Sequence, residues 1–184
     1  MMLLLNYDDG KVQDFLWSAI SSSSIWILPA LFFMAYIFRE RHWRDAIVIL
    51  LCLTLTVVLC DQISSNLIKP MFMRLRPSHD ASIQGMLHYV GNYRGGMYGF
   101  VSSHATNAFG AVTFISGIIR SKRICHCLMV FASCVCYSRV YLGVHYPGDV
   151  VCGAILGMLI GFCIYKVYAY FTSSSFVFCL PKTW

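Results

Sequence analysis

The chain has 184 residues, of which 58% are hydrophobic and only 12% are charged, with a mean hydropathy of +0.66. Soluble domains carry about 25% charged residues, so this composition excludes an ordinary soluble domain and indicates an integral membrane protein. The formal charge of +6 comes from short loops and motif segments, and no run of interleaved basic and aromatic residues predicts a nucleic-acid surface.

The N-terminal residues 1–17 mix apolar and acidic side chains and predict a short interfacial helix capped by Asp8 or Asp9. Beyond it, a spanning helix needs about 20 mostly apolar residues. Five segments meet this requirement: residues 18–38, 46–66, 99–119, 124–142 and 150–171. The predicted fold is all-α, a polytopic membrane helix bundle with about five transmembrane helices plus the interfacial one, in a single domain over residues 1–184.

Two details of these elements carry further expectations. Residues 67–98 are too polar and too rich in proline and glycine to cross a membrane, so we expect a helical extension, a turn and a lid-like loop. In the last span, Gly153, Gly157 and Gly161 recur on one helical face, which lets helices approach closely in a bilayer. We interpret this stripe as packing within the bundle; a homodimer seam would use the same pattern.

The basic residues predict the orientation of the chain in the membrane. The short connections at residues 39–44 and 120–123 are strongly basic, and Lys182 in the tail lies on the same side. The positive-inside rule places this side in the cytoplasm. The loop of residues 67–98 and the turn of residues 138–149 then lie on the non-cytoplasmic side.

Charged groups and histidines from separate spans gather on that non-cytoplasmic side. They are Lys69, Arg76, His104, Arg139, His145 and Asp149. Charges are costly beside hydrocarbon, so such a cluster predicts a functional site. Cations that can face an oxyanion, beside a histidine and an aspartate four residues apart, indicate phosphate chemistry.

The residues form three motifs, K-x6-R-P, S-x-H and S-R-x5-H-x3-D, in that order from Lys69 to Asp149. This pattern resembles the type 2 phosphatidic acid phosphatase (PAP2) superfamily, which includes membrane lipid phosphatases, soluble bacterial acid phosphatases and vanadate haloperoxidases. One departure is that residues 101–104 read Val-Ser-Ser-His, where the family usually has Pro-Ser-Gly-His. The side chain of Ser103 therefore stands where backbone N–H groups of family members cradle phosphate.

The resemblance implies catalytic roles for three residues. His145 would attack phosphorus to give a phosphohistidine, and a helix that begins near Tyr146 would bring Asp149 to the imidazole and fix its tautomer. His104 would protonate the leaving oxygen and then activate the water that hydrolyses the phosphohistidine.

The phosphate itself would be held by cations and hydroxyls. Lys69, Arg76 and Arg139 would bind the non-bridging oxygens, and Ser102 and Ser103 at the start of the third span would add donors. These fixed charges would do what magnesium does elsewhere, so we expect no metal and no cofactor.

Two neighbouring residues match no motif. We expect Arg74 to face lipid head groups or solvent rather than the site. Asp61 lies two turns before Lys69 and would neutralise either Lys69 or Arg139; the sequence leaves open which.

The resulting hypothesis is a metal-independent lipid phosphatase in the bacterial cytoplasmic (inner) membrane, with its site on the periplasmic face. Its partners would be the bilayer and a lipid phosphate. Undecaprenyl diphosphate, hydrolysed to undecaprenyl phosphate, is the first choice, and phosphatidylglycerophosphate or lipid A is the alternative. Two alternative hypotheses belong to other classes of protein. One is a non-catalytic lipid-phosphate binder or transporter, and the other is a vanadate-dependent oxidase. The residues His104, His145 and Asp149 argue against a binder, because binding needs only the cations.

Overall fold

The computed structural model describes residues 2–6, 10–91, 93–119 and 121–175, and within these ranges the chain folds into helices and loops. The helices are α1 (Met2–Leu5), α2 (Lys11–Ser21), α3 (Ile27–Glu40), α4 (Trp43–Gln62), α5 (Lys69–Phe72), α6 (Ser103–Ile118), α7 (Lys122–Tyr141) and α8 (Pro147–Ser175). Short 3₁₀ or π turns lie between some of them: Ser23–Trp26, Ile63–Ile68, Pro77–His79 and Gln84–Met86. The predicted all-α membrane bundle is confirmed.

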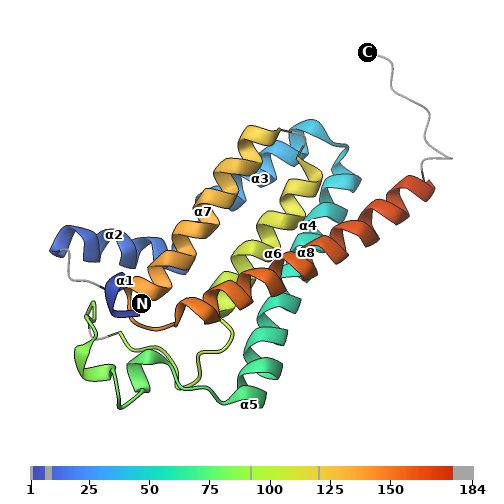
Figure 1. Cartoon of the computed structure of the whole chain (residues 1–184). Helices are drawn as coiled ribbons and strands as arrows, with labels where there is room; N and C mark the ends of the chain where they lie inside the picture. The colour runs from blue at the N-terminus through green and yellow to red at the C-terminus, as the bar shows by residue number, and fades with distance from the viewer. Residues whose placement is uncertain (1, 7–9, 92, 120, 176–184) are drawn as a thin grey trace.

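In the described part of the chain, four helical stretches are long and apolar enough to cross a membrane. They are Ser23–Glu40, Trp43–Phe72, Lys122–Tyr141 and Pro147–Thr172. The remaining predicted span, α6, has 16 residues and lies at the centre of the bundle, where α4, α7 and α8 pack around it (Figure 1). Because neighbouring helices cover α6, it needs no lipid-facing apolar surface of its own.

The first span begins later than the sequence predicts. Helix α2 ends at Ser21, and the chain turns through Ser22, whose hydroxyl accepts a hydrogen bond from the Ser24 N–H before α3 follows. Serine hydroxyls compete for backbone hydrogen bonds in this way and therefore favour helix ends. The boundary lies at Ser23 rather than residue 18 for this reason.

The N-terminal interfacial helix is present as two pieces, α1 and α2, separated in the described residues by Gly10 in a left-handed conformation (φ 93°). The proposed caps Asp8 and Asp9 lie outside the described residues. Val12 and Phe15 of α2 are exposed, as expected of a helix that rests its apolar face on a membrane. Helix α2 packs against α7.

The glycine stripe of α8 packs inside the bundle, against α6. A Cβ at Gly153 would lie 2.7 Å from the Ser102 carbonyl oxygen, and Cβ atoms at Gly157 and Gly161 would collide with the backbone of Thr106 and Gly110. Only glycine permits this close approach of two helix backbones. The interpretation as packing within the bundle is confirmed.

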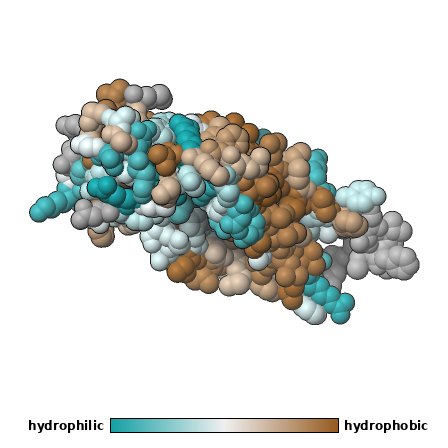
Figure 2. Space-filling model, turned by 90° about the horizontal axis from the view of Figure 1, so that it is seen from below, coloured by the Kyte–Doolittle hydropathy of each residue, from teal (hydrophilic) through white to brown (hydrophobic). Residues whose placement is uncertain are grey.

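The predicted extension, turn and loop between the second and third spans are also present. α4 continues through the π turn into α5, the chain reverses at Met73 in a left-handed conformation, and a single bridge pairs Leu75 with Tyr98. The loop lies at the end of the bundle opposite the α3–α4 and α6–α7 turns (Figure 1). Seen from below, hydrophilic side chains gather at the end of the molecule that carries the loop, and hydrophobic ones cover the helices beside it (Figure 2).

Candidate active site

A cavity of about 600 Å³ opens in the bundle and brings the predicted catalytic and cationic residues together. At one end it is lined by Lys69, Arg76, Tyr93, Ser103, His104, Arg139 and His145. Away from that end it is lined by apolar side chains of α3, α4, α6 and α7, including Phe33, Leu53, Val112, Ile115, Ile119 and Leu128. Ile119 ends α6 at the opposite side of the bundle, so the cavity runs deep into the membrane-embedded part.

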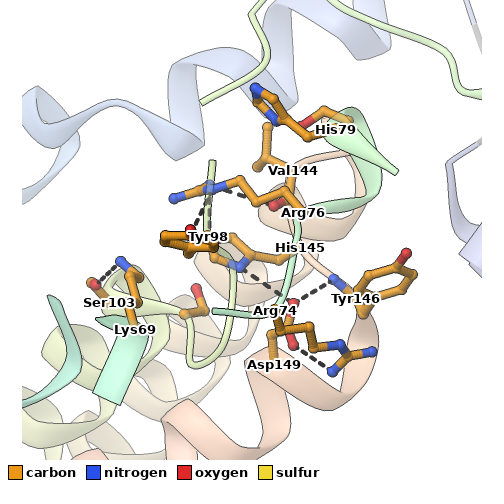
Figure 3. Close-up of polar contacts among 12 residues, drawn as sticks. Lys69, Arg74, Arg76, His79, Tyr98, Ser103, Val144, His145, Tyr146 and Asp149 are labelled. Atoms are coloured by element: carbon orange, nitrogen blue, oxygen red, sulfur yellow. Dashed lines mark hydrogen bonds and ion pairs between the residues drawn. The ribbon is translucent and has the colours of Figure 1, made fainter. Parts of the chain in front are cut away.

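His145 lies at the turn before α8, between Arg76 and Asp149 (Figure 3). Its ring is 1% exposed; Nε2 is 3.1 Å from Arg76 Nη1, and Nδ1 is 3.6 Å from Asp149 Oδ2. A guanidinium has only donors, so Nε2 accepts from Arg76 and the proton of the neutral ring sits on Nδ1, facing Asp149. Nε2 is therefore the nitrogen that carries the lone pair on the cavity side.

The surroundings of His145 keep the ring uncharged. Burial lowers its pKa; Asp149 opposes this shift and the charges of Arg76 and Arg139 add to it, so the pKa falls from 6.5 to about 3. At neutral pH the imidazole is neutral, which is the protonation state required of a nucleophile.

Asp149 is fully buried at the start of α8, and its carboxylate holds the turn in place. Oδ2 accepts the Tyr146 N–H at 3.0 Å and Oδ1 accepts from Arg74 at 2.8 Å. Pro147 begins the helix, a position where its missing N–H costs nothing. The predicted relation between His145 and Asp149, one helical turn apart, is present.

The side chain of Arg74 is 46% exposed, in agreement with the expectation that it faces lipid head groups or solvent, but its guanidinium also contacts the site. Besides its bond to Asp149, its guanidinium stacks on the Tyr146 ring at 4.4 Å from the centroid. The sequence contains a signal for this contact: Arg74 and Arg76 are two apart in an extended segment, where alternate side chains point to the same side.

Lys69 and Ser103 meet at the cationic end of the cavity. Lys69 Nζ donates to the Ser103 hydroxyl at 2.6 Å, and the Ser65 hydroxyl lies 2.9 Å from the same oxygen (Figure 3). The serine that replaces the family's usual glycine thus positions the lysine.

Arg139 is 3% exposed, and its guanidinium is bound by residues that lie outside its own helix, α7. Its Nη1 bonds the hydroxyl of Ser21 in α2, and its Nη2 donates to the Tyr93 hydroxyl at 3.3 Å. The Tyr93 ring also lies 5.6 Å from the guanidinium carbon. The N-terminal helix and the loop therefore both help to orient this cation.

The start of α6 supplies His104 and the adjacent serines. His104 lines the cavity, whereas Ser102 is fully buried and is not among the lining residues. The Ser102 backbone N–H donates to the Asp149 carbonyl at 3.0 Å, and its hydroxyl has no hydrogen-bond partner among the described residues. The geometry thus gives Ser102 a role in joining α6 to α8, and its contact with phosphate stays a prediction.

Asp61 and Asn107 line the cavity beside this cluster. Asn107 Nδ2 donates to Asp61 Oδ1 at 3.5 Å. In the described residues no ion pair within 4.0 Å joins Asp61 to Lys69 or to Arg139, although its charge attracts the Lys69 ammonium. Neither of the two pairings that the sequence left open is formed as a contact.

The arrangement is suited to an anion with a hydrophobic tail. Burial and repulsion from Arg139 lower the pKa of Arg76, so a bound anion would relieve the crowding of positive charge. Ser103 and His104 in the first turn of α6 line the same end of the cavity, and a helix N-terminus favours negative charge. A neutral imidazole, a second histidine and three cations in one cavity are the kinds of group that phosphoryl transfer requires.

The sequence matches the PAP2 superfamily over residues 47–173, and the chain belongs to this superfamily. It is 35% identical over 170 residues to the lipid A 4'-phosphatase of Porphyromonas gingivalis, covering 92% of this chain and 72% of that protein. It is 32% identical to the lipid A 4'-phosphatase of Bacteroides thetaiotaomicron, covering 91% and 75%. The chain is a membrane-embedded lipid phosphatase of the PAP2 type.

Two solved structures share the fold. Aquifex aeolicus LpxE has a TM-score of 0.65 and covers 90% of this chain and 92% of its own. A transmembrane PAP2-type phosphatidylglycerolphosphate phosphatase from Bacillus subtilis has a TM-score of 0.67 and covers 90% and 81%. Each is 22% identical to this chain, so these similarities concern the fold alone.

Proposed function

We propose that the chain removes the 4'-phosphate of lipid A by way of a phosphohistidine. The observation that carries this proposal is the composition of the cavity wall. Two histidines and three cations line one end, and apolar side chains line the deep part. The names of the two relatives that align along nine-tenths of the chain favour the lipid A alternative over undecaprenyl diphosphate, which the sequence alone put first.

In the first half-reaction, Nε2 of His145 attacks phosphorus and the bond from phosphorus to the lipid oxygen breaks. His104 enters this step as the imidazolium and gives its proton to that oxygen as it leaves. Arg76, which contacts Nε2 at 3.1 Å, turns its donors to the phosphate oxygens when substrate binds and uncovers the lone pair. Asp149 stabilises the positive charge that develops on the imidazole ring.

In the second half-reaction, His104 takes a proton from water, and the water oxygen attacks phosphorus. The bond from phosphorus to Nε2 of His145 breaks, inorganic phosphate forms and the imidazole returns to its neutral state. Lys69, Arg76 and Arg139 hold the non-bridging oxygens in both steps. Ser103 holds Lys69, and Ser21 and Tyr93 hold Arg139, so these two charges stabilise the transition state with little reorganisation. The scheme needs no metal.

The deep part of the cavity supports a lipid substrate. A soluble phosphate ester would leave the apolar walls near Leu53 and Ile115 exposed to water. Acyl chains that fill this space bury the apolar surface and place the phosphate at the cationic end.

We also propose that the site faces the periplasm. The basic turns between α3 and α4 and before α7 lie at the other end of the bundle, in agreement with the positive-inside rule (Figure 1). A cysteine introduced at position 94, in a background without reactive native thiols, should react with a thiol reagent that cannot cross the membrane of intact cells. Labelling only after lysis would reverse the orientation.

The test of the function is phosphate release by the purified protein from lipid A, undecaprenyl diphosphate, phosphatidylglycerophosphate and phosphatidate. We expect lipid A to have the highest kcat/KM, and mass spectrometry to show a product that lacks the 4'-phosphate and keeps the 1-phosphate. The reaction should proceed in EDTA. A higher kcat/KM for undecaprenyl diphosphate, or loss of the 1-phosphate, would refute the assignment.

A further inference from the structure

Asp61 and Asn107 form a polar pair in the cavity that the phosphoryl-transfer scheme does not use. Asp61 comes from α4 and Asn107 from α6, and both line the same cavity as the two catalytic histidines. The residues one turn deeper on the same helices, Val57 and Ala111, are apolar and also line it. The pair therefore marks the border between the cationic end and the apolar remainder.

The position of the pair is fixed relative to His104. Asn107 is three residues beyond His104 on α6, which places it about 4.5 Å deeper along the helix at a rise of about 1.5 Å per residue. His104 is the proposed proton donor to the oxygen that joins phosphate to lipid. The Asp61–Asn107 pair thus faces the part of the lipid that comes directly after this oxygen.

The pair has more acceptors than donors. An ionised carboxylate has about four lone-pair sites and no donor. Asp61 has one long hydrogen bond, from Asn107 at 3.5 Å, and Asn107 Oδ1 is buried with no partner in the described part of the chain. Buried acceptors without donors are costly, so a ligand that fills the cavity has to supply O–H or N–H groups at this depth.

The geometry points to Asp61 and Asn107 as a specificity subsite that accepts hydrogen bonds from a hydroxyl or amide N–H close to the phosphate of the lipid. This inference rests on the proposed function and deepens it. The glucosamine ring that bears the 4'-phosphate of lipid A also carries a hydroxyl at C6' and an amide N–H at C2'. Polyprenyl phosphates and phosphatidate carry none outside the phosphate, so the subsite would disfavour them.

Two substrates with matched chains test the subsite on the unmodified protein. Ceramide 1-phosphate has a free hydroxyl and an amide N–H next to its phosphate, whereas phosphatidate has two esters there. In mixed micelles at equal mole fraction, we expect kcat/KM for ceramide 1-phosphate to exceed that for phosphatidate by about tenfold or more, the usual effect of leaving a charged acceptor unpaired. Equal efficiencies would overturn the inference.

Variants distinguish a specificity subsite from a general effect of Asp61 on the charge of the neighbouring Lys69. Asp61→Asn and Asn107→Leu should each lower the ratio of the two kcat/KM values at least about threefold. Val57→Ile, one turn from Asp61 on the same helix, changes shape without changing hydrogen bonding and should keep the wild-type ratio. Equal losses on both substrates, with the ratio unchanged, would mean that Asp61 acts only on the charge of Lys69 and would overturn the subsite.

Failure of the subsite and failure of the function give different results. If the subsite is wrong, phosphate is still released from lipid A, ceramide 1-phosphate and phosphatidate, with no dependence on the donor groups. If none of the three lipids releases phosphate, the proposed function itself is wrong.

Discussion

Lys69 donates a hydrogen bond to the hydroxyl of Ser103, with Nζ 2.6 Å from Oγ, and this bond ties the end of the second span to the start of α6. The family usually has glycine at this position, where only the backbone can contact phosphate. Here the additional hydroxyl orients a cation instead. Ser103, which departs from the usual motif, therefore makes a contact with Lys69 that glycine could not make.

Replacing Ser103 with glycine should weaken the site although it restores the usual motif. The Lys69 ammonium would lose its anchor, and a hydrogen bond to a charged group contributes about 1.5–3 kcal/mol. We expect kcat/KM to fall at least about tenfold, measured as phosphate release. Ser65→Ala, which removes the other contact of the Ser103 hydroxyl but leaves the lysine bond, is the matched control and should have a smaller effect. Unchanged kinetics for the glycine variant would show that Lys69 needs no anchor.

The phosphohistidine should be detectable directly. Substrate labelled with ³²P in the phosphate, mixed with enzyme and quenched in alkali, should leave label on the protein, because phosphohistidine is stable to alkali and labile to acid. His145→Ala should abolish this label and phosphate release while lipid binding is retained. Label that persists in this variant would assign the nucleophile to another residue.

Arg74 should act as a positioning residue. It holds Oδ1 of Asp149 at 2.8 Å, so Arg74→Ala frees the carboxylate that orients the nucleophile. We expect kcat to fall about five- to tenfold with little change in KM, since a partly exposed charge pair contributes about 1 kcal/mol. Arg94→Ala is a suitable control, because Arg94 lies in the same loop and stacks on Tyr89. Equal effects of the two substitutions would indicate a general effect of loop charge.

Acid should destabilise the protein partly through His145. Its pKa is about 3 in the folded state and 6.5 as an ordinary value, so the unfolded chain binds a proton that the folded chain does not between these pH values. The stability from this residue is present above pH 6.5 and is lost as the pH falls toward 3. The decrease in Tm from pH 7 to pH 5 in detergent should be smaller for His145→Asn than for wild type. An identical decrease would mean that the ring titrates normally.

Much of the fold was predictable because its determinants are local. Apolar runs of sufficient length, basic turns and the Gly153–Gly157–Gly161 stripe are all readable from the chain, and the structure bears them out. Helix boundaries were less predictable, since Ser22 ends a helix by a side-chain contact that hydropathy does not encode.

The candidate site was predictable where motif spacing fixed the residues, and less so where contacts cross between elements. The convergence of Lys69, His104 and His145 on one cavity followed from their place at one membrane face. The contact of Arg74 with Asp149 joins residues 75 positions apart and depends on how the loop folds back. The cavity-facing position of Asn107 likewise required the packing of α4 against α6.

The backbone-to-backbone contact of α6 with α8 has a consequence for how the enzyme tolerates its surroundings. His104 starts one of these helices and Asp149 starts the other, and the Ser102 N–H joins the two ends. The proposed proton donor and the carboxylate behind the proposed nucleophile therefore belong to one rigid pair of packed helices. Changes in bilayer thickness or the passage of bulky acyl chains would be absorbed by the outer helices, leaving the spacing of the reacting groups unaltered.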